Sequence, residues 1–158
     1  MKRTVDFKKG SGYITSAFIT LFVCLLILLL MTFWSAVANV QSFKGSARNV
    51  LDTYVGETSV GIFDGLKNSD DRVFSFNSSA YNEKLIEFCG LTEDGGTLKK
   101  YNPDLLYTVS VPTLSVDTAE LNIKMECTVT VPLYFCGIKI SDAVADVSIN
   151  SFYEDIFD

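Results

Sequence analysis

The chain has 158 residues, a length that predicts one domain, and a formal net charge of −6. It contains no histidine, which excludes Ser-His-Asp triads, Cys-His nucleophiles and histidine-containing zinc sites. Residues 1–12 carry four basic side chains and one acid, which leaves 9 of the 13 Lys/Arg and 18 of the 19 Asp/Glu for the remainder. An acidic remainder without a basic cluster argues against nucleic-acid binding, because such binding depends on neutralising phosphates.

Residues 13–38 contain no charged side chain and predict a transmembrane helix, because about 20 apolar residues cross the hydrocarbon layer in that form. Tyr13 and Trp34 stand near its two ends, as interfacial aromatic residues do. The basic residues of segment 1–12 predict a cytoplasmic leader. Residues 39–158 are therefore expected to form an extracellular domain at the cell membrane.

A secretory signal peptide is the competing interpretation of the same segment. Ala36-Val37-Ala38 has the A-x-A pattern of a cleavage site that follows an apolar run. The run exceeds the about 7–15 residues typical of such a peptide, which favours a retained anchor. Cleavage after Ala38 would instead release a soluble secreted domain.

Apolar residues continue at spacings of three and four beyond the membrane segment, so one long helix is expected to run to about Leu66. Its outer half is amphipathic. Each glycine in this half weakens the helix by about 1 kcal/mol relative to alanine, and a bend or break near Gly56 or Gly61 is compatible with the sequence.

A short second helix is expected after a polar turn. Ser78 or Ser79 can cap its start, and Gly90 can end it in a left-handed conformation. One face of this helix carries Tyr81, Leu85, Phe88 and Cys89. Residues 93–96 follow as a loop.

Residues 119–131 alternate between apolar and polar side chains, the pattern of a half-buried antiparallel strand with its odd positions inward. A strand is expected before it at 105–111, and one or two after it within 138–149, with the turn at 132–137. The predicted fold class is α+β: a long N-terminal helix, transmembrane then amphipathic, packed on a small antiparallel sheet of about 3–4 strands.

Three cysteines lie in the outer domain, where disulfides are permitted, whereas Cys24 lies in the membrane segment. Cys127 and Cys136 belong to inward-facing sets of neighbouring strands and could face each other across a hairpin. Cys89 is a rival partner for either, and three buried thiols are the alternative. No Cys-x-x-Cys spacing is present, so neither a metal site nor a cofactor is expected.

Acidic pairs occur at Asp70-Asp71 and Glu93-Asp94, but they lack the spaced oxygen ligands of a calcium loop. No residue pattern selects a catalytic group or a small-molecule substrate. The chain is therefore not expected to be an enzyme.

The order of these parts resembles type IV pilin-like proteins, and within them the TadE-like minor pilins and pseudopilins of Gram-positive bacteria. Residues 8–14 are similar to a prepilin leader boundary, and residues 129–138 are similar to the strand, Pro-aromatic turn and strand of this group. The resemblance implies cleavage by a prepilin peptidase after Gly12, with Tyr13 as the new first residue. A cut between Gly10 and Ser11 is the second choice.

One position departs from that family. Pilins usually carry a glutamate at the fifth mature position, where its carboxylate pairs with the amino terminus of a neighbouring subunit. Here that position is Ala17, or Thr15 for a cut after Gly10. The departure implies either no cleavage or a place at the tip or edge of a filament.

The resemblance implies a non-catalytic minor subunit of a type IV or Tad-type pilus or a related secretion filament on the cell surface. Its partners would be membrane lipid, other pilin-like subunits and a prepilin peptidase. Neighbouring helices would replace lipid around Phe18, Leu21, Leu25 and Leu28 during assembly. The alternative function is a membrane-anchored extracellular binding module, an adhesin or a sensor domain, whose helix is a passive anchor.

Overall fold

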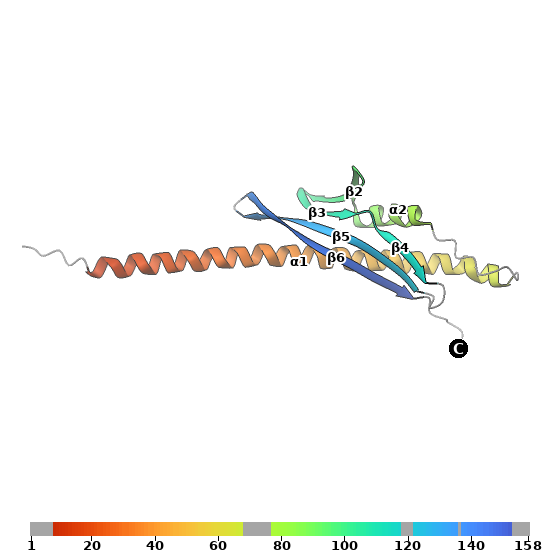
Figure 1. The fold of residues 1–158 in the computed structure, drawn as a ribbon, viewed down its shortest axis with the longest axis horizontal. Helices are drawn as coiled ribbons and strands as arrows, with labels where there is room; N and C mark the ends of the chain where they lie inside the picture. Colours follow the sequence, from red (N-terminus) through yellow and green to blue (C-terminus); the bar gives the residue numbers. More distant parts are fainter. Residues whose placement is uncertain (1–7, 68–76, 118–121, 136, 153–158) are drawn as a thin grey trace, which may run out of the picture.

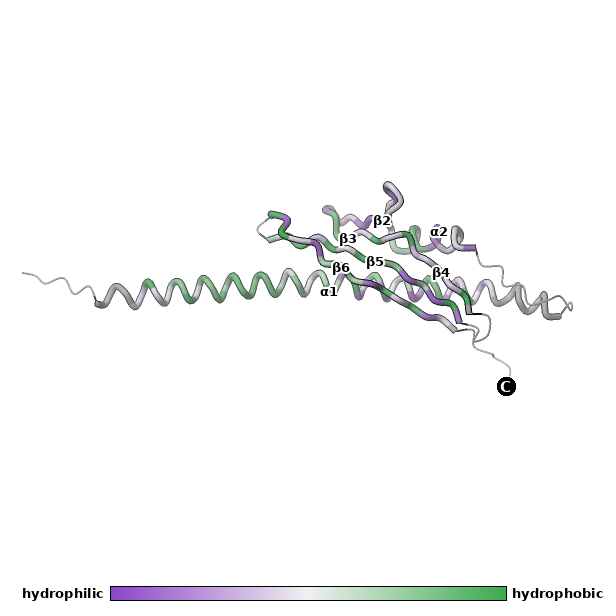
Figure 2. Tube along the Cα trace, in the orientation of Figure 1, coloured by the Kyte–Doolittle hydropathy of each residue, from purple (hydrophilic) through white to green (hydrophobic). Residues whose placement is uncertain are grey.

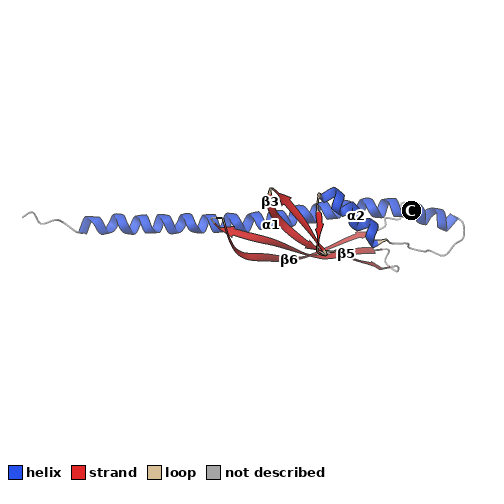
Figure 3. Ribbon diagram, turned by 90° about the horizontal axis from the view of Figure 1, so that it is seen from above, coloured by secondary structure: helices blue, strands red, loops and turns tan. Residues whose placement is uncertain are grey.

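A computed structural model describes residues 8–67, 77–117, 122–135 and 137–152. A long helix lies along one face of an antiparallel sheet, and a short second helix packs beside it (Figures 1 and 3). The elements in chain order are α1 (Lys8–Lys67), α2 (Ser78–Cys89), β1 (Thr92–Asp94), β2 (Thr97–Asn102), β3 (Asp104–Ser110), β4 (Thr113–Asp117), β5 (Asn122–Phe135) and β6 (Ile138–Phe152). The predicted α+β class is confirmed.

Strand β5 is the centre of the sheet. One of its edges pairs with β6 from Asn122 to Phe135. Its other edge pairs first with β4, at residues 122–126, and then with β3, at Val129 and Thr130. Beyond β3 the sheet continues outward with β2 and then β1, which lies at the edge, and every pair is antiparallel.

The sheet has six strands, so the prediction of about three or four was too small. Strands β1 and β2 were missed because they are short and carry little alternation, and β4 because it is only five residues long. Of the six residues of β2, only Leu98 is fully buried, and all three residues of β1 are exposed. Strand β1 and β2 form a tight hairpin around Gly95 and Gly96, whose φ angles are 60° and 76°, where the sequence predicted a loop.

Helix α1 is continuous, as the sequence predicted, and passes Gly45 and Gly56 without a break. Its outer half buries one stripe against β5, β6 and α2, which consists of Phe43, Ala47, Val50, Leu51, Tyr54 and Val55. Packing of this stripe offsets the low helix propensity of the glycines. Burial begins at Ala36, so contact with the rest of the domain starts inside the predicted membrane segment.

The predicted inward positions of the central strand are confirmed where the structure describes them: Ile123, Met125, Cys127, Val129 and Val131 are all buried, and Leu121 lies outside the described residues. Val147 and Ile149 of β6 join them. The ring of Phe43 meets that of Tyr107 edge to face, with centroids 5.7 Å apart.

Helix α2 ends as predicted, at Gly90 with φ 57° and ψ 50°, but its cap is Asn77 rather than Ser78 or Ser79. The Asn77 Oδ1 atom accepts hydrogen bonds from the backbone N–H groups of Ser79 and Ala80. The predicted burial of Phe88 is also wrong, because its side chain is 62% exposed. The buried residues of α2, Tyr81, Leu85 and Cys89, are spaced four positions apart. Each step of four turns about 40° around the helix axis, which moves the buried face away from Phe88.

The turn after β5 is shorter than predicted. Pro132 does not begin it but lies within β5, opposite Asp142, and the strand continues to Phe135. The missing N–H of Pro132 is tolerated there because the pairing of β5 with β3 ends at Thr130. Strands β5 and β6 therefore form one long hairpin that turns at Gly137, whose φ is 80°.

We predict that Phe43→Ala lowers the free energy of unfolding by about 3–5 kcal/mol, because the side chain is fully buried between α1 and β3. Phe88→Ala is the matched control and should change it by about 0.5 kcal/mol or less, since Phe88 is exposed. Urea unfolding of the full chain in detergent micelles, followed by circular dichroism, measures both. Equal losses would contradict the packing described.

Candidate functional site

The N-terminal half of α1 is apolar on all sides and lies outside the core (Figure 2). Within the described residues it is the one helix long and apolar enough to cross a membrane. None of its most apolar 18-residue window is buried, unlike the core helix of a soluble protein. A signal sequence near the N-terminus satisfies the same criteria of length and composition.

The four residues predicted to form an assembly face, Phe18, Leu21, Leu25 and Leu28, are all exposed, between 40% and 70%. Their spacing of three, four and three residues places them along one side of α1. An exposed apolar surface of this extent requires a covering of lipid or of other helices.

Two threonine side chains in this half of α1 form hydrogen bonds to the helix backbone. The Thr20 hydroxyl donates to the Ser16 carbonyl oxygen at 2.9 Å, and that of Thr32 donates to the Leu28 carbonyl oxygen at 3.0 Å. Hydroxyl groups satisfied in this way can enter hydrocarbon at low cost, because no donor is left without an acceptor.

The predicted processing positions lie in the first two turns of α1, which begins at Lys8. Tyr13 is 80% exposed, and a Cβ atom added at Gly12 would meet nothing within 4 Å. Gly10 and Ser11 precede them on the same helix. The Gly12–Tyr13 bond is thus on an uncovered stretch of backbone.

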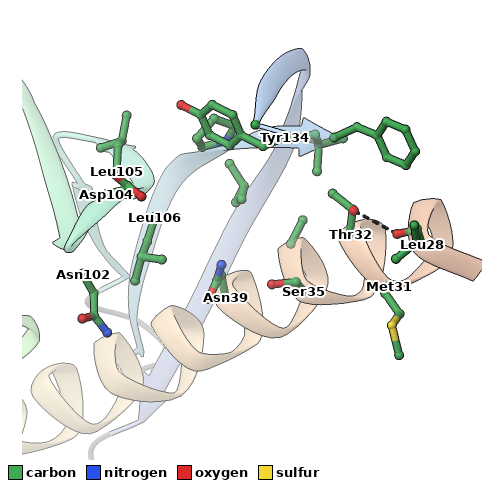
Figure 4. A pocket seen from close by; sticks show the side chains of 16 residues that line it. Leu28, Met31, Thr32, Ser35, Asn39, Asn102, Asp104, Leu105, Leu106 and Tyr134 are labelled. Carbon is green, nitrogen blue, oxygen red and sulfur yellow. Dashed lines mark hydrogen bonds between the residues drawn. The ribbon is translucent and has the colours of Figure 1, made fainter.

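A groove of about 940 Å³ opens where the uncovered half of α1 meets the domain (Figure 4). Leu28, Thr32, Ser35 and Asn39 line it from α1, and Ser35 and Asn39 point toward the strands. The opposite wall belongs to the end of β2, the start of β3 and the end of β5: Asn102, Asp104, Leu105, Leu106, Val131, Pro132, Leu133, Tyr134 and Phe135. Sequence reasoning missed this groove because it placed residues 132–135 in a turn.

Neither predicted disulfide of Cys127 is formed, because Cys89 and Cys127 are both free thiols. The hairpin register pairs Cys127 with Val147, far from the turn that follows Phe135. Cys136 itself lies outside the described residues. Cys24 is exposed on the apolar half of α1.

The two buried thiols are poor nucleophiles. Burial, together with the nearby Asp146 carboxylate, raises the pKa of Cys127 to about 12. Burial also raises the pKa of Cys89, against the opposing effect of the Lys100 ammonium. Because the thiolate is the reactive form, these environments suit packing rather than chemistry.

Acidic side chains of the described residues do not gather into a metal-binding group. Asp94, from one predicted acidic pair, binds the Lys99 ammonium at 2.6 Å, and this hydrogen bond lowers the pKa of its carboxyl group. Glu57 pairs with Lys84, and Asp142 with Lys139. Asp70 and Asp71, from the other pair, lie outside the described residues.

Comparisons with models of protein families, with curated protein sequences and with solved structures find no match to this chain. Inferences about its function therefore rest on the residues and the geometry described above.

We predict that the domain loses stability as the pH rises from about 9 to 12. Because the folded-state pKa of Cys127 is raised, the thiol loses its proton at lower pH in the unfolded state than in the folded state. Between the two pKa values, this one thiol reduces the free energy of unfolding by up to about 1.4 kcal/mol per pH unit. Urea titrations at successive pH values measure the slope, which should be shallower in Cys127→Ala.

Cys24→Ala is the control, because Cys24 lies outside the core, and its slope should match that of the unmodified chain. The slope that remains in Cys127→Ala belongs to the other buried groups, among them Tyr107, whose pKa burial raises to about 12. An unaltered slope in Cys127→Ala would show that Cys127 titrates normally in the folded protein.

Proposed function

We propose that this chain is a non-catalytic, membrane-anchored minor subunit of a pilin-like filament, assembled through the N-terminal half of α1. The observation that carries the proposal is that the uncovered apolar helix and the helix that holds the sheet are one unbroken element. A passive anchor needs no such continuity, whereas a subunit that moves from lipid into a helical bundle must transmit the movement to its outer domain.

The proposed orientation places the N-terminus in the cytoplasm and the sheet outside the cell. Four basic residues precede the apolar segment, and none occurs between Tyr13 and Phe43. The acidic remainder of the chain then faces the extracellular solvent, where its net charge favours solubility.

Retention of the helix is supported by its packing. Cleavage at the signal-peptide pattern after Ala38 would cut within a continuous helix and would remove Ala36, which is 4% exposed, from the core. Cleavage after Gly12 would leave the entire core intact, since all of its described residues follow that position.

Assembly without a glutamate near the start of the helix favours a tip or edge position. No carboxylate lies between Tyr13 and Phe43, so this subunit cannot neutralise the amino terminus of a neighbour within the bundle. A buried unpaired charge is costly, and a repeating position in the shaft would create one at every contact.

A membrane-anchored binding module is the second candidate, and the groove beside α1 favours it. Its volume of about 940 Å³ is within the range of small-molecule sites, and its walls combine apolar side chains with Asn39, Asn102 and Asp104. In that case function would depend on the groove residues of α1 and not on the apolar segment that precedes Leu28.

We predict that protein recovered from membranes of its host begins at Tyr13, or at Ser11, with α1 otherwise retained. Mass spectrometry and N-terminal sequencing measure the start. A start at Asn39 would indicate a secreted domain and exclude the assembly mechanism. An intact Met1 would favour the binding module.

We predict that Leu25→Lys abolishes membrane insertion or filament incorporation, because a charge near the centre of the apolar segment costs about 2.5–3.5 kcal/mol. Leu25→Met is the matched control and should behave as the unmodified chain. Fractionation of membranes and of sheared surface filaments, with detection by antibody, measures both steps.

Exchange of residues 13–27, which precede the groove, for the corresponding part of an unrelated membrane helix separates the two candidate functions in the same assay. Insertion should persist and incorporation into filaments should fail. Normal incorporation of that chimera, or of Leu25→Lys, would contradict assembly through α1.

A further inference from the structure

The tip of the β5–β6 hairpin, here residues 133–135 and 137–140, is uncharged except for Lys139. This composition contrasts with the acidic remainder of the domain, in which acids outnumber basic residues. Several large apolar side chains at and beside the tip are exposed rather than packed: Tyr134, Ile138, Ile140 and Val144. Ile138 is 71% exposed, more than Leu21 or Leu25 of the apolar helix. Exposed apolar side chains gathered at one end of a domain mark a contact surface.

The tip lies beside the apolar half of α1 rather than beside the core (Figure 1). Tyr134 and Phe135 share the groove with Leu28 and Thr32, and Figure 4 shows Tyr134 on the strand wall opposite this part of the helix. Leu28 precedes Trp34 by six residues, which is about 9 Å along a helix axis. If Trp34 marks the outer boundary of the hydrocarbon layer, a tip beside Leu28 therefore lies up to about 9 Å inside that boundary.

The single ion pair beside the tip is compatible with such a position. The Lys139 ammonium lies 2.8 Å from an Asp142 carboxylate oxygen, and both side chains are about half exposed. The pair adds no net charge, and the flexible lysine stem allows its ammonium to remain among lipid headgroups. Tyrosine at position 134 is likewise a residue that favours the interface, with an apolar ring and a polar hydroxyl.

We propose that the tip of the β5–β6 hairpin inserts into the outer leaflet of the membrane that α1 spans, as a second contact between the domain and lipid. The occupant of the exposed tip is thus lipid, because the tip continues the apolar surface of α1 and lacks the acidic charge of the remaining domain. The inference rests on the anchoring part of the proposed function.

Tryptophan fluorescence tests this inference in the full chain reconstituted into liposomes at low protein density. Trp34 is the single tryptophan of the sequence, so Trp34→Phe gives a silent background. In that background Ile138→Trp and, as a second probe, Ile140→Trp report on the tip, and both replace exposed side chains. Phe88→Trp is the matched control, an exposed aromatic position on α2, away from the groove. The quencher is a phospholipid brominated in the upper part of its acyl chains.

We expect both tip probes to emit at shorter wavelength than Phe88→Trp, and brominated lipid to quench them at least half as strongly as Trp34 of the unmodified chain. Tip probes that match Phe88→Trp, while Trp34 is quenched, would overturn the inference and leave the anchor intact. A blue-shifted but unquenched tip would also overturn it, because protein, such as a second copy, would then cover the tip. Absence of quenching at Trp34 would refute the anchor and the inference together.

Discussion

Phe43, Ala47 and Leu51 pack against the rest of the domain with almost no exposed surface, on a helix that continues unbroken into an uncovered apolar half. Burial of these three side chains fixes where the sheet sits along α1 and which side of the helix it covers. The position of the groove and of the β5–β6 hairpin relative to the apolar half follows from this one contact. Because interiors pack closely, the sheet cannot slide along the helix without losing it.

Polar contacts within the same region strengthen this arrangement. The Tyr81 hydroxyl, fully buried, donates to the Met125 Sδ atom at 2.8 Å, and its ring meets that of Tyr54 edge to face. The Ser151 hydroxyl donates to an Asp52 carboxylate oxygen at 2.7 Å, which fastens the end of β6 to α1. Buried hydroxyls with partners avoid the cost of desolvation, so these contacts specify the fit of helix to strands.

The parts of the fold that the sequence predicts well are those with many residues in one pattern. The stripe of α1 and the alternation from Ile123 to Val131 repeat often enough to identify both elements and their buried faces. Strands β1 and β2 bury too few side chains to produce a pattern, and β4 is too short, at five residues, for its alternation to identify it. Pro132 was assigned to a turn because a proline is tolerated in β5 only beyond the last pair with β3, and the local sequence does not show where that pairing ends. The groove and the cross-strand neighbour of Cys127 depend on the register of β5 against β6, which no local pattern encodes. The apolar surface of α1, by contrast, is predicted from composition alone.

The hydrogen bond between Ser151 and Asp52 joins residues 99 positions apart, so it can form only after both ends of this span have been synthesised. A ribosome releases α1 before β6, so the helix is available before the strands that cover its outer half exist. Contacts of such long range form slowly, and the stripe around Leu51 stays open to misassociation until the last strand arrives. Newly made chains thus pass through a period in which α1 is complete but its stripe is uncovered, and a chain truncated before β6 would remain in that state.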